Sequence, residues 1–180
     1  MTTLVWLRRD LRLADNPALA EAGKLGPVLP VYILDETEPR PDGAASRWWL
    51  HHSLASLAKT LPNLTLLRGD PATLLPELAR QTGAARVHWN RCYEPHAIAR
   101  DGALKAALKD QGVEVQSSNG ALLNEPWEVT TGGGGPYKVY TPFWRACLKL
   151  PLLPPAPAPK LTFSKGLSKN LDLASLDLQP

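Results

Sequence analysis

The chain has 180 residues, 44% of them hydrophobic and 21% charged, and a net charge of +3 at pH 7. This composition excludes a chain that is disordered throughout, and the charge alone does not indicate a nucleic-acid-binding protein. The two cysteines are too few for a disulfide framework, and no apolar run approaches the ~20 residues of a membrane span. We therefore expect a cytoplasmic protein with one main domain and no membrane contact.

Patterns typical of strands and helices alternate along the first two thirds of the chain. A strand is expected first, and the two types then alternate, at 3–7, 15–23, 27–34, 44–61, 64–67, 70–83, 85–90, 94–111 and 113–115. Asn16 and Asp70, each followed by proline, are typical helix N-caps. Gly23 and Gly83 are expected to end the same two helices.

Such alternation with short connections is typical of a parallel sheet with helices on both faces. The sequence therefore predicts an α/β fold, namely a Rossmann-like, doubly wound five-stranded parallel sheet in three layers, α/β/α. We assign this domain to residues 1–130, a closing loop and motif to 131–150, and a proline-rich interdomain linker to 151–180. The dense proline between 151 and 159 favours extended polyproline II over a packed core.

Polar residues follow the predicted strands at their carboxyl ends, where sheets of this type bind ligands. They are Arg8, Arg9 and Asp10 after the first strand, Asp35 and Glu36 after the second, and residues 90–94, with Cys92 and Glu94, after the fourth. The run at 8–12 suits either an anion site or a set of internal salt bridges that tie the loop, and the tie is the favoured interpretation. A small buried thiol is likewise the favoured interpretation of Cys92.

Two adjacent aromatic residues, Trp48 and Trp49, stand near the start of the helix expected at 44–61. We expect one ring to face the sheet and the other to cover a planar ligand or a second domain. The sequence contains no glycine-rich phosphate loop and no metal-ligand spacing among its four histidines. Because no catalytic triad or carboxylate pair can be selected, we predict neither a catalytic site nor a metal site in this chain.

Several motifs together carry a family resemblance. The chain resembles the DNA photolyase/cryptochrome family in the stretches Trp6–Leu19, Ser46–Leu57, Leu67–Pro71, Val87–Pro95 with Arg100-Asp101, and Tyr137–Trp144. These motifs stand in the family's order and are most similar to those of bacterial photolyases that repair cyclobutane pyrimidine dimers. The resemblance covers only the N-terminal α/β domain and the start of the linker. The family's FAD-binding helical domain is absent from this chain.

The resemblance implies a light-harvesting role. In the family, the α/β domain often holds an antenna chromophore. The full-length protein would be a deoxyribodipyrimidine photo-lyase, a carbon-carbon lyase that repairs UV-induced pyrimidine dimers in DNA with blue light and reduced FAD. On this interpretation the present chain alone is inactive, and the full-length protein is a monomer. Two alternatives stay open: a cryptochrome-type blue-light photoreceptor, and a stand-alone nucleotide- or flavin-binding α/β module.

The resemblance also indicates which residues line the antenna pocket. Asp35 matches a family pocket carboxylate, while Cys92 and Glu94 fall at two further pocket positions. Trp49 is assigned to a pocket wall. By contrast, the resemblance leaves Arg9 and Asp10 in the structural loop tie.

The sequence departs from the pattern of the folate-binding members at two positions, and this bears on the type of antenna. His96 and Ala97 stand where folate-binding members of the family carry an Asn-Glu pair. The resemblance therefore favours a deazaflavin, FMN or FAD antenna over a folate.

Overall fold

A parallel sheet forms the centre of the fold. The computed structural model describes residues 1–152, 154–167 and 170–179. Within them lies a five-stranded parallel sheet with the order β3-β2-β1-β4-β5. Its strands are β1 (Thr3–Leu7), β2 (Val28–Asp35), β3 (Thr65–Gly69), β4 (Arg86–Asn90) and β5 (Glu114–Ser118). The strand order reverses between β1 and β4, which confirms the predicted doubly wound sheet.

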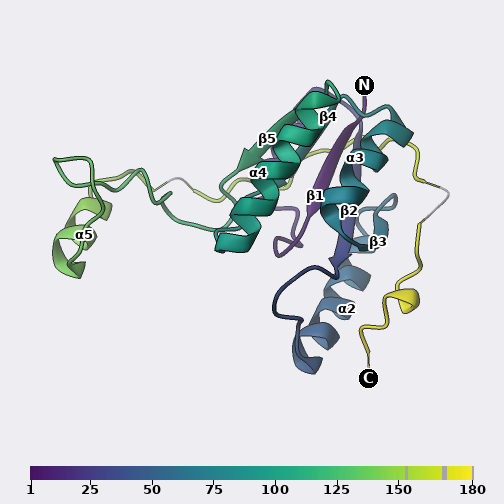
Figure 1. Cartoon of the computed structure of the whole chain (residues 1–180), viewed down its shortest axis with the longest axis horizontal. Helices are drawn as coiled ribbons and strands as arrows, with labels where there is room; N and C mark the ends of the chain where they lie inside the picture. The colour runs from purple at the N-terminus through teal and green to yellow at the C-terminus, as the bar shows by residue number, and fades with distance from the viewer. Residues whose placement is uncertain (153, 168–169, 180) are drawn as a thin grey trace.

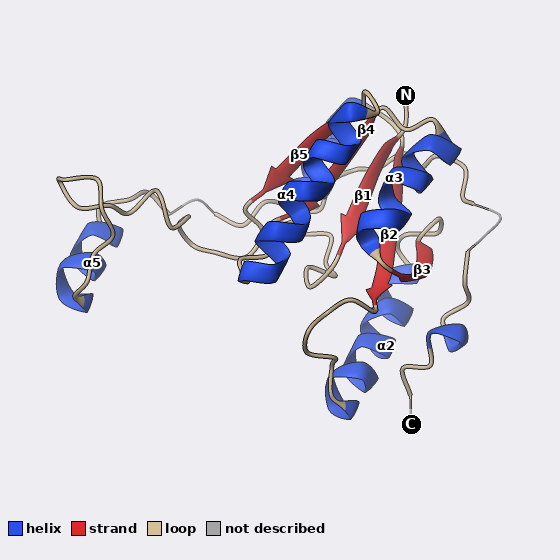
Figure 2. Cartoon of the chain, viewed as in Figure 1, coloured by secondary structure: helices blue, strands red, loops and turns tan. Residues whose placement is uncertain are grey.

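Helices cover both faces of this sheet (Figures 1 and 2). The four long helices are α1 (Pro17–Leu25), α2 (Ala44–Ala58), α3 (Pro71–Thr82) and α4 (Pro95–Asp110). One buried cluster packs α3 and α4 on the sheet through Leu75 and Leu104. A second cluster packs α1 and α2 on the other face through Leu19 and Leu54. The predicted three-layer α/β/α architecture is confirmed.

Two helix ends test the prediction that a glycine ends a helix. Gly83 takes φ 61° and ends α3, as predicted. The predicted end of α1 at Gly23 is wrong, because the helix continues to Leu25 and ends at Gly26, which has φ 132°. Gly23 instead permits a close approach, since a Cβ at this position would lie 2.8 Å from the side chain of Leu161.

Two later elements were incompletely predicted. The strand expected at 113–115 is β5, which continues through three polar residues to Ser118 because its backbone stays paired with β4. A helix that the sequence patterns did not indicate, α5 (Tyr140–Cys147), falls within the closing motif. In Figure 1 this helix stands away from the sheet on an extended part of the chain.

The adjacent tryptophans of α2 differ from the prediction. Neither ring is buried against the sheet: Trp48 is 47% exposed and Trp49 is 70% exposed. The helix is anchored instead by Leu54 and Leu57, its buried residues. In Figure 1 the helix extends past the tip of β2, while Leu54 and Leu57 pack in the cluster on one face of the sheet.

The C-terminal segment returns to the domain after its proline-rich stretch. Residues 154–158 are exposed, in keeping with the expected extended chain. Phe163 then forms a parallel bridge with Val28, and Leu176 and Leu178 are buried in the cluster beneath α1 and α2. Around Leu176 the chain forms a short 3-10 helix, η1 (Ala174–Leu176). The segment therefore contributes to the core of the domain.

None of the helices in the described residues combines the length and apolarity that a membrane crossing needs.

A histidine is buried inside the sheet. His88 of β4 is fully buried, and neither ring nitrogen has a hydrogen-bond partner among the described residues. Burial lowers the pKa of His88 below its ordinary value, against the opposing effect of Glu114. The folded protein therefore favours the neutral imidazole.

We expect the free energy of unfolding to decrease as the pH falls below about 6.5, where an unfolded histidine binds a proton that the folded protein disfavours. The stability that neutral His88 contributes is fully present above the ordinary histidine pKa. It is lost as the pH falls towards the lower pKa that His88 has in the folded state. His88→Leu should flatten the pH dependence, measured by urea unfolding at a series of pH values. His52→Leu, at an exposed position, should leave the slope unchanged. An equal slope in wild type and His88→Leu would assign the effect to another group.

Candidate functional site

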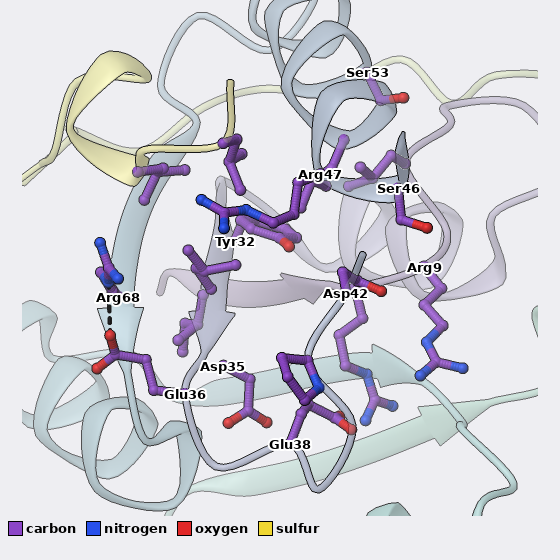
Figure 3. Close-up of a pocket in the computed structure, with 18 of the residues that line it drawn as sticks. Arg9, Tyr32, Asp35, Glu36, Glu38, Asp42, Ser46, Arg47, Ser53 and Arg68 are labelled. Atoms are coloured by element: carbon purple, nitrogen blue, oxygen red, sulfur yellow. Dashed lines mark hydrogen bonds and ion pairs between the residues drawn. The ribbon is translucent and has the colours of Figure 1, made fainter. Parts of the chain in front are cut away.

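A cavity of about 700 Å³ opens at the carboxyl ends of β1 and β2. Its floor includes Trp6 and Tyr32 from these strands, and its walls come from the loop at 36–42, the first turns of α2 and residues 176–178. Figure 3 shows Asp35, Glu36 and Glu38 along one side of the hollow and Tyr32 with Arg47 across from them. The location agrees with the ligand-binding edge of doubly wound sheets.

Asp35 is held by the protein on both carboxylate oxygens. The amide and hydroxyl of Thr37 donate to Oδ1 at 2.8 and 2.6 Å. The guanidinium of Arg100, from α4, donates to Oδ2. Asp35 therefore fixes the end of β2 against α4, and lines the cavity as part of this arrangement.

A network of ion pairs continues from Arg100 beneath the cavity. Arg8 makes two hydrogen bonds to the carboxylate of Asp101, at 3.1 and 2.9 Å. Arg100 also donates to Asp101, at 3.2 Å. Burial opposes the charge of Arg100, but Asp101 and Asp35 outweigh it and raise the pKa of Arg100 above its ordinary value. The network joins β1, β2 and α4.

The same two arginines lie against the floor of the cavity. The guanidinium carbons of Arg8 and Arg100 are 4.3 and 5.1 Å from the ring centroid of Trp6. Trp6 in turn packs edge-on against Trp89, with ring centroids 5.9 Å apart. These contacts fix the aromatic floor in one orientation.

Trp49 and Cys92, two of the residues that the family resemblance singled out, also line the cavity. Burial raises the pKa of the Cys92 thiol, outweighing the opposite effect of Arg8. The thiol therefore stays protonated near neutral pH and is a poor nucleophile. Cys92 acts here as a small apolar wall.

Glu94 occupies a different place. It stands at the N-cap position of α4 and pairs with the exposed Arg9. It lines a neighbouring cavity, also of about 700 Å³, and is not among the residues that line the first. The structure thus brings Asp35, Trp49 and Cys92 together and leaves Glu94 beside them.

Arg9 and Asp10 have separate partners. Asp10 is buried and accepts hydrogen bonds from the Arg8 amide, at 2.7 Å, and from the side chain of Asn90. Arg9 turns outward to Glu94. Asp10 therefore ties the loop from within and Arg9 ties it to Glu94 at the surface, and the two do not pair with each other.

The sequence patterns did not single out several residues of the cavity. Tyr32 is 7% exposed, and burial, followed by Asp42 and Asp35, raises the pKa of its hydroxyl. Its hydroxyl makes no hydrogen bond within the described residues. Arg100 had a signal, because it stands in a family motif, but nothing in the sequence indicates its partner 65 residues away. The residues at 176–178 carried no signal of a pocket.

The site is suited to binding. It combines an aromatic floor with charged walls whose carboxylates and guanidiniums are mostly paired with each other. Asp42 also lines the cavity, outside these ion pairs. The described residues do not place three or more His, Cys, Asp or Glu side chains where they could hold a metal ion. A cavity of this size can hold a small molecule.

Comparison with known proteins places the chain in a family. The profile of the DNA photolyase family matches residues 3–160, and the chain belongs to this family. It is 46% identical to the deoxyribodipyrimidine photo-lyase of Agrobacterium fabrum, over 98% of this chain and 38% of that protein. It is 40% identical to cryptochrome-1 of Arabidopsis thaliana, over 93% of this chain and 26% of that protein.

Structural comparison gives the same result. The crystal structure of a bacterial class III photolyase from Agrobacterium tumefaciens matches with a TM-score of 0.90 and 45% identity. The match covers 99% of this chain and 38% of that one. The chain thus spans about two fifths or less of the length of these relatives, and the part it matches is their α/β domain.

Proposed function

We propose that this chain is the light-harvesting domain of a deoxyribodipyrimidine photo-lyase and holds an antenna chromophore in the cavity at the strand ends. The observation that carries the proposal is the cavity of about 700 Å³, with its aromatic lining, in a domain of the DNA photolyase family. A small-molecule site commonly has about this volume. Absorbing light and passing on the excitation requires no acid, base or nucleophile.

The residues present fit a planar chromophore. Trp49 offers an exposed ring at the wall, and the Tyr32 hydroxyl is a donor without a partner in the described residues. The bound group would supply the light absorption. Trp49 would cover its ring, Tyr32 would donate to a polar edge, and Asp35 with Arg100 would keep the wall rigid. Deazaflavin, FMN and FAD are the favoured occupants, because His96 and Ala97 stand in place of the folate pair.

The full-length protein would join this domain to an FAD-binding helical domain that binds pyrimidine dimers in DNA. We propose residues 1–130 as the antenna domain, 131–150 as the closing motif, and 151–180 as the connection between domains. A monomer in the cytoplasm is the favoured state, and the two free cysteines, Cys92 and Cys147, are typical of a reducing compartment.

A cryptochrome-type photoreceptor is the second candidate. The observation that favours it is the 40% identity to cryptochrome-1 of Arabidopsis thaliana. The two candidates differ in the fate of damaged DNA. The test mixes the full-length protein with an oligonucleotide that contains pyrimidine dimers under blue light. Loss of the dimers supports the photolyase assignment. No loss under reducing conditions with bound FAD supports the photoreceptor.

Trp49→Ala should weaken chromophore binding about tenfold, because it removes ring contact worth on the order of 1 kcal/mol or more. The melting temperature should stay unchanged, since the ring is 70% exposed. We would titrate the chain with 8-hydroxy-5-deazaflavin, FMN and FAD, with methenyltetrahydrofolate for comparison, and follow fluorescence. Trp48→Ala is the matched control, because Trp48 does not line the cavity. Equal weakening by both variants, or no saturable binding of any compound, would contradict the proposed pocket.

The chain alone should not repair DNA. With FAD, a reductant and blue light supplied, we expect the dimer content of an irradiated oligonucleotide to stay constant, because the domain that would hold the FAD beside the lesion is not in this chain. The full-length protein serves as the positive control in the same chromatographic assay. Light-dependent loss of dimers with residues 1–180 alone would overturn this expectation.

A further inference from the structure

The segment at 170–179 contacts both the sheet and the cavity. We call these residues the C-terminal strap. At its start, Asn170 uses its side chain as a backbone substitute: Oδ1 accepts from the Leu66 amide at 2.6 Å, and Nδ2 donates to the Leu64 carbonyl at 3.3 Å. The Leu171 amide donates to the Leu66 carbonyl at 3.0 Å. The strap thus begins as a partner of the outer edge of β3.

The middle of the strap is anchored in the core. Leu176 is fully buried and Leu178 is 3% exposed, both in the cluster that includes Leu54 and Tyr32. Between them, Asp177 takes a left-handed conformation with φ 49° and turns its carbonyl to the guanidinium of Arg47. The turn before it is closed by Asp172, which accepts from the Ser175 amide at 2.7 Å.

The same residues form one wall of the cavity. Leu176, Asp177 and Leu178 line it together with Tyr32 and Arg47. A molecule in the cavity therefore touches the strap on one side and the sheet and α2 on the other. If the strap leaves, the cavity loses this wall and the ligand loses the corresponding contacts.

From this geometry we propose that docking of the C-terminal strap and binding of the chromophore stabilise each other. A ligand that contacts the docked strap, and makes no such contact with a strap that has left, binds the docked state more tightly. Ligand binding therefore shifts the equilibrium between the two states towards the docked one. Linkage requires the reciprocal effect, so a loosened strap lowers the affinity for the ligand by the same factor. The inference rests on the proposed function, because the ligand is the planar chromophore assigned to this cavity.

The coupling also involves a part of the chain outside the α/β sheet. Its residues are the last that the structure describes, and they follow the proline-rich chain that we assign to the connection between domains. Occupation of the cavity would therefore also hold the strap that follows this connection against the domain.

Asn170→Ala tests the coupling, because Asn170 holds the strap to β3 and does not line the cavity. Hydrogen exchange of the 170–179 region is measured with and without FMN, and affinities for FMN, FAD and 8-hydroxy-5-deazaflavin are measured by titration. In the wild type we expect the flavin to slow exchange in the strap. In Asn170→Ala we expect faster exchange and an affinity about fivefold lower. Asn119→Ala, which removes side-chain hydrogen bonds to the backbone of residues 121–122 and to Tyr93 and none to the strap, should change neither.

The outcomes separate this proposal from the proposed function. Faster strap exchange in Asn170→Ala with unchanged flavin affinity would overturn the coupling and leave the chromophore site intact. Unchanged exchange in Asn170→Ala would overturn the role assigned to Asn170 and the coupling argued from it. No saturable binding of any flavin to the wild type would overturn the chromophore site and the coupling with it. If Asn170→Ala does not fold, Asn170→Asp takes its place. It keeps the acceptor for the Leu66 amide and loses the donor to the Leu64 carbonyl, and we expect changes in strap exchange and flavin affinity between those of the wild type and those expected for Asn170→Ala.

Discussion

Leu176→Ala should lower the free energy of unfolding by about 3 kcal/mol, the usual effect of emptying a fully buried leucine position. Leu176 is 0% exposed and packs in the cluster beneath α1 and α2, although it lies in a stretch whose composition indicates a linker. The surrounding leucines belong to a sheet and helices that cannot fully collapse into the space. Urea unfolding followed by circular dichroism measures the effect.

Leu152→Ala is the matched control for this substitution. Leu152 lies in the same C-terminal part of the chain but is 72% exposed. We expect its effect to stay within about 0.5 kcal/mol, as for other surface substitutions. Equal effects of the two substitutions would show that the strap is detached from the core in solution.

Asp101→Asn should also cost about 3 kcal/mol. The side chains of Asp101, Arg8 and Arg100 are only 10%, 9% and 13% exposed. Removing the charge of Asp101 leaves Arg8 without its carboxylate partner in a place where water cannot replace it. Arg100 keeps Asp35 and Glu38, so the unpaired charge is concentrated on Arg8. The same unfolding experiment measures this change.

Glu94→Gln provides the comparison at the surface. Its partner Arg9 has a side chain that is 68% exposed. Water and salt screen such a pair, and we expect a loss of less than about 1 kcal/mol. If Asp101→Asn costs no more than Glu94→Gln at the same ionic strength, the buried network does not stabilise the fold as its geometry indicates.

The layers of the fold could be predicted because they depend on local patterns. Strand and helix segments alternate with short connections, and this alone fixes a parallel sheet with helices on both faces. Asn16 and Asp70 could be assigned as caps for a similar reason, since the bond each makes lies within three residues. Gly23 shows the limit: whether a glycine ends a helix or admits a distant side chain depends on the fold.

The site could be predicted only in part. Asp35 and Cys92 follow strands, so the topology of the sheet brings them to one edge. The partner of Asp35, however, is Arg100, and such a pairing depends on where α4 lies above the sheet. Burial of Leu176 could not be predicted either, because the prolines before it indicate extended chain and no periodic pattern marks the return to the core.

The strap has a consequence for how the protein is made. Leu176 and Leu178 complete a buried cluster that begins with Val5, so β1 cannot be fully covered until residues 176–178 have emerged from the ribosome. Until then, the leucines on that face of the sheet are open to solvent and to other nascent chains. Contacts this distant in sequence form slowly, and partly synthesised chains with exposed apolar surface are the species that chaperones bind. Once residues 176–178 have emerged from the ribosome, the cluster can close and this risk falls.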